Sequence, residues 1–344
     1  MTNQPKILIV YTGGTIGMVK DYNTGALKAF DFSQISSKIP ELQQLNCEIN
    51  TISFDEPIDS SNMNVAYYIQ IAEIISDNYD KFDGFVVLTG SDTMSYTSSA
   101  ISFMFENLQK PVIFTGSQLP IGDLRTDAKE NLITSIQVAS AYENGKPVIQ
   151  EVGLYFEYKL YRANRTTKIN AEQFEAFASM NYPPLAESGV HLNFNYPLLL
   201  KSKENQNDLV VRKNLDNHVA ILKLFPGITE LVVRSFMNIP DLKGIILETY
   251  GSGNAPTKKW FLDAIKEALD RNLIILNVTQ CLAGSVEMWR YETGVHLLEL
   301  GVISGYDMTT ETAVTKLMYL LANCGTIEEV KEGLSKSLQG EIHL

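Results

Sequence analysis

Short apolar runs alternate along this chain with longer segments of helical periodicity. In residues 65–78, for example, apolar positions such as Tyr68 and Ile71 recur at three- and four-residue steps, which indicates an amphipathic helix. This alternation predicts βαβ units, because parallel strands need a crossover between them. Runs rich in Val, Ile and Leu predict strands at 6–11, 84–88, 111–115, 152–156, 219–224, 244–247 and 273–278.

The predicted strands lack polar alternation, so we expect them to be buried on both faces between layers of helices. Further helices are predicted at 127–143, 311–322 and 327–338. The rhythm breaks between about His191 and Asn217, where residues 201–214 are polar and rich in charge. We therefore expect an α/β fold of two domains. Their bounds are 1–190 for a larger N-terminal doubly wound domain, 191–217 for a linker, and 218–344 for a smaller C-terminal α/β domain.

The composition agrees with two folded domains, and the net charge excludes some classes of binding partner. The chain has 344 residues, of which 45% are hydrophobic and 20% charged. Its net charge of -12 repels nucleic acid and anionic membranes, so we expect neither as a partner. The apolar runs stop far short of a membrane span, and a first strand at Lys6 leaves no room for a signal peptide. We expect a cytoplasmic protein.

The cysteines and histidines point away from disulfides and metal sites. Three widely separated cysteines, none in a CxxC pair, fit a reducing compartment. The four histidines form no HxH or HxxxH pair, so we expect no metal.

The first predicted strand leads into a turn of two glycines and a hydroxyl residue, Gly13, Gly14 and Thr15. Such a turn exposes backbone N–H groups beside Thr15. A plain strand-to-loop turn and a phosphate-binding loop are the alternatives, although the full GxGxxG and GK[ST] patterns are missing.

Small polar residues also follow other strands. Ser91 and Asp92 come after the strand at 84–88, where they could simply cap a helix. Similar residues occur at 59–62 and 115–117, and strand ends of this kind converge on one cleft. A basic segment containing Lys168 is either a solvated loop or a proton-relay partner beside Asp92, because a hydroxyl nucleophile needs a group that accepts its proton.

Taken in order, these motifs resemble those of the bacterial-type L-asparaginases, and the type I, intracellular branch is the most similar. The resemblance covers almost the whole chain and rests on the segments TGGTIG, DSSNM, GSDTM, TGSQLP, RTDAKEN, NRTTK, YGSGNAP, TQC and GYDMTTE. It implies the asparaginase/glutaminase-like fold, hydrolysis of L-asparagine to L-aspartate and ammonia, and no cofactor or metal.

The resemblance also implies roles for individual residues. Thr15 would be the nucleophile that forms a β-aspartyl ester, with Ser91, Asp92 and Lys168 as a second hydroxyl–acid–base set. The substrate-binding positions would be Ser60 and Ser61 for the α-carboxylate, Asp92 for the α-ammonium, and Gly14, Gly90 and Ser91 around the oxyanion.

Three positions depart from the family pattern. Thr89 stands where members usually have histidine, and Ser91 stands where they usually have threonine. Many members have a tyrosine at the position of Ala26, for which Tyr22 is the nearest substitute.

Asn254 and Tyr291 resemble residues that reach a neighbouring subunit's site, so the resemblance implies a homodimer or homotetramer. Some intracellular members also carry a second asparagine site with an arginine at the position of Glu248. We expect that site to be lost and Cys281 to be buried.

Other functions stay open at this point. A glutaminase-asparaginase of broader specificity is the closest alternative, because one methylene in a pocket is worth only about 1–3 kcal/mol. A catalytically silent amino-acid sensor would explain the departures at positions 26 and 91. A nucleotide-dependent enzyme is more remote, because no phosphate-loop signature is present.

Overall fold

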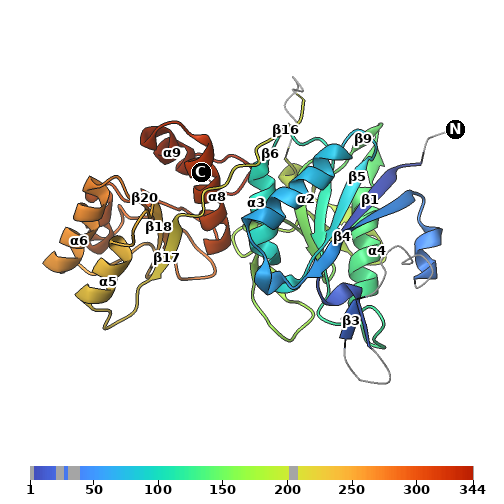
Figure 1. Ribbon diagram of the computed structural model, residues 1–344, viewed down its shortest axis with the longest axis horizontal. Helices are drawn as coiled ribbons and strands as arrows, with labels where there is room; N and C mark the ends of the chain where they lie inside the picture. Colours follow the sequence, from blue (N-terminus) through green and yellow to red (C-terminus); the bar gives the residue numbers. More distant parts are fainter. Residues whose placement is uncertain (1–3, 21–26, 30–38, 201–207, 344) are drawn as a thin grey trace. The chain divides into compact units, whose positions relative to one another are not determined.

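The computed structural model describes residues 4–20, 27–29, 39–200 and 208–343 (Figure 1). Tyr22 and Ala26 lie outside the described residues. The chain divides into two compact units, residues 1–213 and 214–344. Within the described ranges, no helix combines the length and the apolar character needed to cross a bilayer.

The N-terminal unit is built on an eight-stranded sheet in the order β15-β14-β11-β10-β7-β5-β1-β4. Five neighbouring strands are parallel, namely β4 (Glu48–Ile58), β1 (Lys6–Gly13), β5 (Gly84–Leu88), β7 (Val112–Thr115) and β10 (Val152–Phe156). Three antiparallel strands complete it, namely β11 (Lys159–Arg162), β14 (Ala186–Ser188) and β15 (Leu192–Phe194). The carboxyl ends of the parallel strands therefore share one edge of the sheet.

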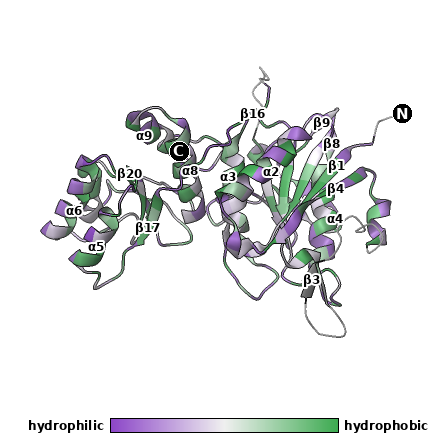
Figure 2. Ribbon diagram, in the orientation of Figure 1, coloured by the Kyte–Doolittle hydropathy of each residue, from purple (hydrophilic) through white to green (hydrophobic). Residues whose placement is uncertain are grey.

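Helices cover both faces of this sheet (Figure 1). The helices are α2 (Val65–Asp77), α3 (Met94–Met104) and α4 (Ala128–Ala139). Alternate residues of β1, including Ile7 and Ile9, pack with Leu132 and Ile136 of α4 in one buried cluster. The hydrophobic colouring of the central strands in Figure 2 reflects their burial between two helical layers.

The C-terminal unit has a parallel four-stranded sheet of β17 (Val219–Lys223), β18 (Gly244–Thr249), β19 (Ile274–Thr279) and β20 (Ile303–Ser304). Its helices are α5 (Glu230–Met237), α6 (Lys259–Asp270), α7 (Glu292–Leu300), α8 (Thr310–Asn323) and α9 (Ile327–Leu334). Strand β17 lies at the sheet edge, where Ile221 is 37% exposed. The expectation of burial on both faces is therefore wrong for this strand.

Short elements fill the connections of the N-terminal unit. The strand pairs are β2 (Met18–Lys20) with β3 (Leu27–Ala29), β6 (Phe105–Glu106) with β16 (Val210–Val211), β8 (Tyr142–Glu143) with β9 (Lys146–Pro147), and β12 (Thr167–Lys168) with β13 (Phe177–Ala178). The 3-10 turns are η1 (Thr15–Gly17), η3 (Pro40–Gln44), η4 (Ser60–Asn62), η5 (Ser91–Thr93), η6 (Ala163–Arg165) and η7 (Tyr196–Leu198).

Ordered strands occupy part of the segment that the sequence suggested as a linker, residues 191–217. Strand β15 completes the large sheet, and β16 pairs with β6. The side chains of Leu192 and Phe194 pack against the N-terminal core, which ties the start of this segment to the sheet. The division between the two units falls at Lys213 and Asn214.

Candidate active site

The turn that carries Thr15 begins directly at the carboxyl end of β1. Gly14 has a φ of 85°, and a Cβ atom built on it would lie 2.4 Å from the backbone nitrogen of Gly90. A side chain at position 14 would therefore collide with the residue that follows β5 by two positions, so glycine is required there. This close approach brings the Thr15 turn against the loop after β5.

The segment after β4 reaches the same place. A Cβ atom on Gly90 would lie 2.5 Å from Oγ of Ser60, and the hydroxyl of Thr93 donates a hydrogen bond of 2.8 Å to the Ser60 carbonyl. Ser60 is buried, whereas Ser61 is exposed. Three strand ends, those of β1, β4 and β5, thus meet around Gly14, Gly90 and Ser60.

Ser61 is held by the acid that precedes it. Both its backbone N–H and its hydroxyl donate hydrogen bonds of 2.8 Å to Oδ1 of Asp59. These two bonds lower the pKa of Asp59, because they stabilise the charged carboxylate.

Lys168 joins the loop after β5 from a segment 76 residues further along the chain. Its Nζ lies 2.6 Å from Oδ1 of Asp92 and 2.8 Å from Oγ of Ser91. The lysine side chain is only 17% exposed, while the Asp92 side chain is 68% exposed. The arrangement therefore links the Ser91 hydroxyl to a shielded lysine and leaves the Asp92 carboxylate open to a ligand.

Gln118, for which the sequence predicted no role, also contacts this group. Its Oε1 accepts a hydrogen bond of 3.1 Å from the Ser91 hydroxyl, and its Nε2 donates one of 3.1 Å to the Gln173 carbonyl. The segment TGSQLP places Gln118 just after β7, one strand along from β5. Its place in this segment, just after a parallel strand, was the signal that the sequence offered.

Asn254 and Tyr291 lie in the C-terminal unit. Asn254 closes a turn after β18 through backbone bonds with Tyr250, and its Oδ1 accepts a hydrogen bond of 2.8 Å from the Thr293 hydroxyl. Tyr291 caps α7, is 49% exposed, and lies beneath the guanidinium of Arg290.

The position that resembles a second asparagine site is occupied by a partnered acid. The Glu248 carboxylate accepts a hydrogen bond of 2.6 Å from Thr310 and lies 3.4 Å from Nζ of Lys223. Cys281 is exposed in the loop after β19, so the expectation that it is buried is wrong. A loop residue is shielded only when another element covers it, which the local sequence does not reveal.

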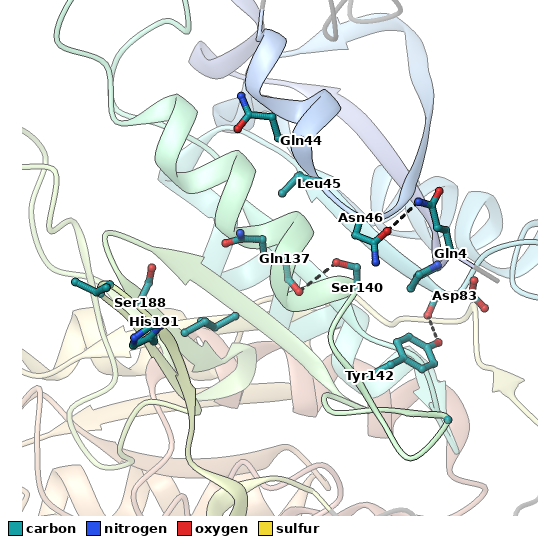
Figure 3. A pocket seen from close by; sticks show the side chains of 15 residues that line it. Gln4, Gln44, Leu45, Asn46, Asp83, Gln137, Ser140, Tyr142, Ser188 and His191 are labelled. Atoms are coloured by element: carbon teal, nitrogen blue, oxygen red, sulfur yellow. Dashed lines mark hydrogen bonds between the residues drawn. The ribbon is translucent and has the colours of Figure 1, made fainter. Parts of the chain in front are cut away.

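A polar groove of about 1230 Å³ lies elsewhere on the N-terminal unit (Figure 3). It is lined by Gln4, just before β1, and by Asp83, just before β5. It therefore sits at the amino ends of the parallel strands, opposite the edge that holds Thr15 and Ser91. Folds of this class bind ligands at the carboxyl ends, so the size of this groove does not make it the active site.

Among the residues whose positions are described, no group of three or more His, Cys, Asp or Glu side chains is arranged to hold a metal ion.

Comparisons with known proteins cover both units. The family model described as "Asparaginase, N-terminal" matches residues 6–200, and "Glutaminase/Asparaginase C-terminal domain" matches residues 218–334. The chain is 43% identical to L-asparaginase 1 of Escherichia coli, over 98% of this chain and 97% of that one.

Two solved structures are also similar. The crystal structure of L-asparaginase I from Vibrio cholerae matches with a TM-score of 0.90 and 40% identity, covering 99% of this chain and 100% of that one. The thermostable L-asparaginase from Thermococcus kodakarensis matches with a TM-score of 0.88 and 32% identity, covering 98% and 99%.

Proposed function

The chain belongs to the asparaginase family, and we propose that it hydrolyses L-asparagine to L-aspartate and ammonia through Thr15. The Thr15 hydroxyl oxygen attacks the side-chain carboxamide carbon, and its proton passes to the departing nitrogen as the carbon–nitrogen bond breaks. Water then cleaves the resulting β-aspartyl ester, which releases aspartate and restores the threonine. The meeting of the ends of β1, β4 and β5 around Gly14 is the observation that carries this proposal.

Lys168, Ser91 and Asp92 serve proton transfer in this scheme. A threonine hydroxyl is a weak nucleophile unless a nearby group accepts its proton. The contacts of 2.8 Å and 2.6 Å from Nζ of Lys168 support a relay in which Asp92 orients the lysine and Nζ, as a free amine, takes the proton that the Ser91 hydroxyl gives up.

The substrate's charged groups have matching partners at the same edge. We assign the α-ammonium to the exposed Asp92 carboxylate and the α-carboxylate to Ser60 and Ser61. For its hydroxyl to donate to the substrate, Ser61 must turn away from Asp59. Backbone N–H groups at Gly90 and Ser91, or in the Thr15 turn, would stabilise the oxyanion.

We further propose that the protein is cytoplasmic and works as a homodimer or homotetramer. The reducing-compartment cysteine pattern supports the first part. The second rests on Asn254 and Tyr291, which we assign to the active site of a neighbouring subunit. Sedimentation velocity would test it against the 38.4 kDa mass of one chain.

The decisive experiment follows ammonia release from L-asparagine and L-glutamine side by side, with Thr15→Ala as the control. We expect Thr15→Ala to lose several orders of magnitude in kcat, because the covalent route is gone, while its melting temperature changes little. If this variant kept more than a few per cent of wild-type activity, Thr15 would not be the nucleophile. Equal rates on both substrates would favour a glutaminase-asparaginase, and a silent wild-type protein that still binds asparagine would favour a sensor.

A further inference from the structure

Gln118 bridges the proposed relay to a fixed point of the backbone. The Gln173 carbonyl can only accept a hydrogen bond, so the nitrogen of the Gln118 amide must face it and Oε1 must face Ser91. In the resting geometry Nζ of Lys168 donates a hydrogen bond of 2.8 Å to Oγ of Ser91, so the Ser91 proton must point elsewhere. These two constraints assign the Ser91 proton to the Gln118 oxygen.

The loop that carries Gln118 is itself anchored at the start of α4. The backbone N–H groups of Gln118 and Leu119 donate to the two carboxylate oxygens of Asp127, at 2.9 Å and 3.1 Å. Asn131 donates to the Gly116 carbonyl at 3.0 Å and to Asp127 at 3.3 Å. Asp127 and Asn131 are both buried, so the loop has little freedom to shift.

A serine at position 91 needs such an anchor. A serine hydroxyl has three staggered rotamers available, whereas the second heavy atom on Cβ of a threonine restricts them. Only a rotamer that keeps Oγ against Nζ of Lys168 serves the relay.

We propose that Gln118 is a positioning residue, which holds the Ser91 hydroxyl in the rotamer that contacts Lys168. This inference rests on the proposed function. In this view the hydrogen bond from Ser91 to Gln118 restricts the Ser91 rotamer, as the β-methyl group of a threonine would restrict it by steric contact.

The test compares Gln118→Met in three backgrounds, because methionine matches glutamine in size and removes both amide hydrogen bonds. With Ser91 present, we expect kcat for asparagine to fall about three- to tenfold, as unproductive rotamers become populated. In Ser91→Thr the same change should cost less than about twofold, because the threonine is already restricted. In Ser91→Ala, where no hydroxyl remains to be positioned, it should cost nothing further. Gln137→Leu, at an exposed position of α4, is the control for substitution of a glutamine in the same unit.

An equal loss in all three backgrounds would overturn the proposal, because Gln118 would then act on the substrate pocket rather than on Ser91. Full activity of Gln118→Met with Ser91 present would overturn it as well. A crystal structure of Gln118→Met supplies a readout that does not depend on turnover. We expect Oγ of Ser91 to occupy a second rotamer there, and a single unchanged rotamer would refute the positioning role. An inactive wild-type enzyme would instead count against the proposed function. The crystal structure of Gln118→Met would still test the positioning role, because the Ser91 rotamer can be read without turnover.

Discussion

One hydroxyl group is all that distinguishes serine from alanine at position 91, yet it lies 2.8 Å from Nζ of Lys168. We expect Ser91→Ala to lower kcat about 10²- to 10⁴-fold, the range typical of a lost proton-transfer group. Ser91→Thr keeps the hydroxyl and should be tolerated or mildly beneficial. Steady-state ammonia release from the three proteins checks this, and equal activity in all of them would reduce Ser91 to a helix cap.

Individual residues differ in how well the sequence predicted their surroundings. The placement of Ser91 and Lys168 in one group followed from short motifs after strands and from a family resemblance. Gln118 was missed because one glutamine in a loop carries no pattern, and its role depends on the distant Gln173 carbonyl. The burial of Cys281 was predicted wrongly because it depends on tertiary packing.

At the scale of elements, the hairpin between β10 and β11 places Glu157 close to other carboxylates. Burial, and then the neighbouring carboxylates of Asp127, Glu130 and Glu175, raises the pKa of Glu157 from 4.5 to about 6. Ionised Glu157 is therefore disfavoured in the folded state. Stability is lost as the pH rises from about 4.5 through about 6, and the full penalty applies above that range.

Glu157→Gln should remove this penalty without changing the side chain's size. We expect it to stabilise the protein above pH 6 by less than about 1 kcal/mol, since solvent screens a partly exposed group. Below pH 4.5 the variant and the wild type should unfold alike. Urea unfolding at pH 4.5 and pH 7.5 measures both, and a gain that is the same at the two pH values would assign the effect to something other than ionisation.

The C-terminal segment is fastened to α8 by a buried ion pair between Lys316 and Glu341. Nζ of Lys316 lies 2.7 Å from the carboxylate, and both side chains are 0% exposed. We expect Glu341→Gln to cost about 3–5 kcal/mol, because it leaves the lysine as an uncompensated buried charge. The matched substitution Glu332→Gln breaks an exposed pair with Lys336 and should change the urea midpoint little. Similar shifts in both variants would show that the buried pair contributes no more than a surface one.

Elements buried on both faces were the ones that the sequence predicted best. Strands β5 and β10 match their predicted ranges, because buried parallel strands are continuous apolar runs. Strand β4 was not predicted because much of it is exposed and its sequence mixes polar and apolar residues. Strand β15 lies at a sheet edge in the segment expected to be a linker, and its pairing with β14 is a tertiary outcome that composition does not indicate.

At the scale of the whole molecule, the remaining question is whether asparagine also regulates the enzyme. An effector's α-carboxylate would need a cation, which an arginine supplies through a bidentate pair. Position 248 instead carries a glutamate, held by Thr310 and Lys223. Repulsion between two carboxylates at contact distance is worth about 1–4 kcal/mol, which matches or exceeds typical coupling energies of about 1–3 kcal/mol.

We therefore expect a hyperbolic dependence of rate on asparagine concentration, with a Hill coefficient of one whatever the number of subunits. Initial rates over a wide range of asparagine concentrations measure it, and sedimentation velocity on the same sample establishes the assembly. Cys281→Ser should leave the curve unchanged, because the exposed thiol would then line no effector site. A Hill coefficient clearly above one that falls to one in Cys281→Ser would show that an effector site survives. The ion pair of Glu248 with Lys223 would then be the first contact to test, since its rearrangement would free a cation for the effector.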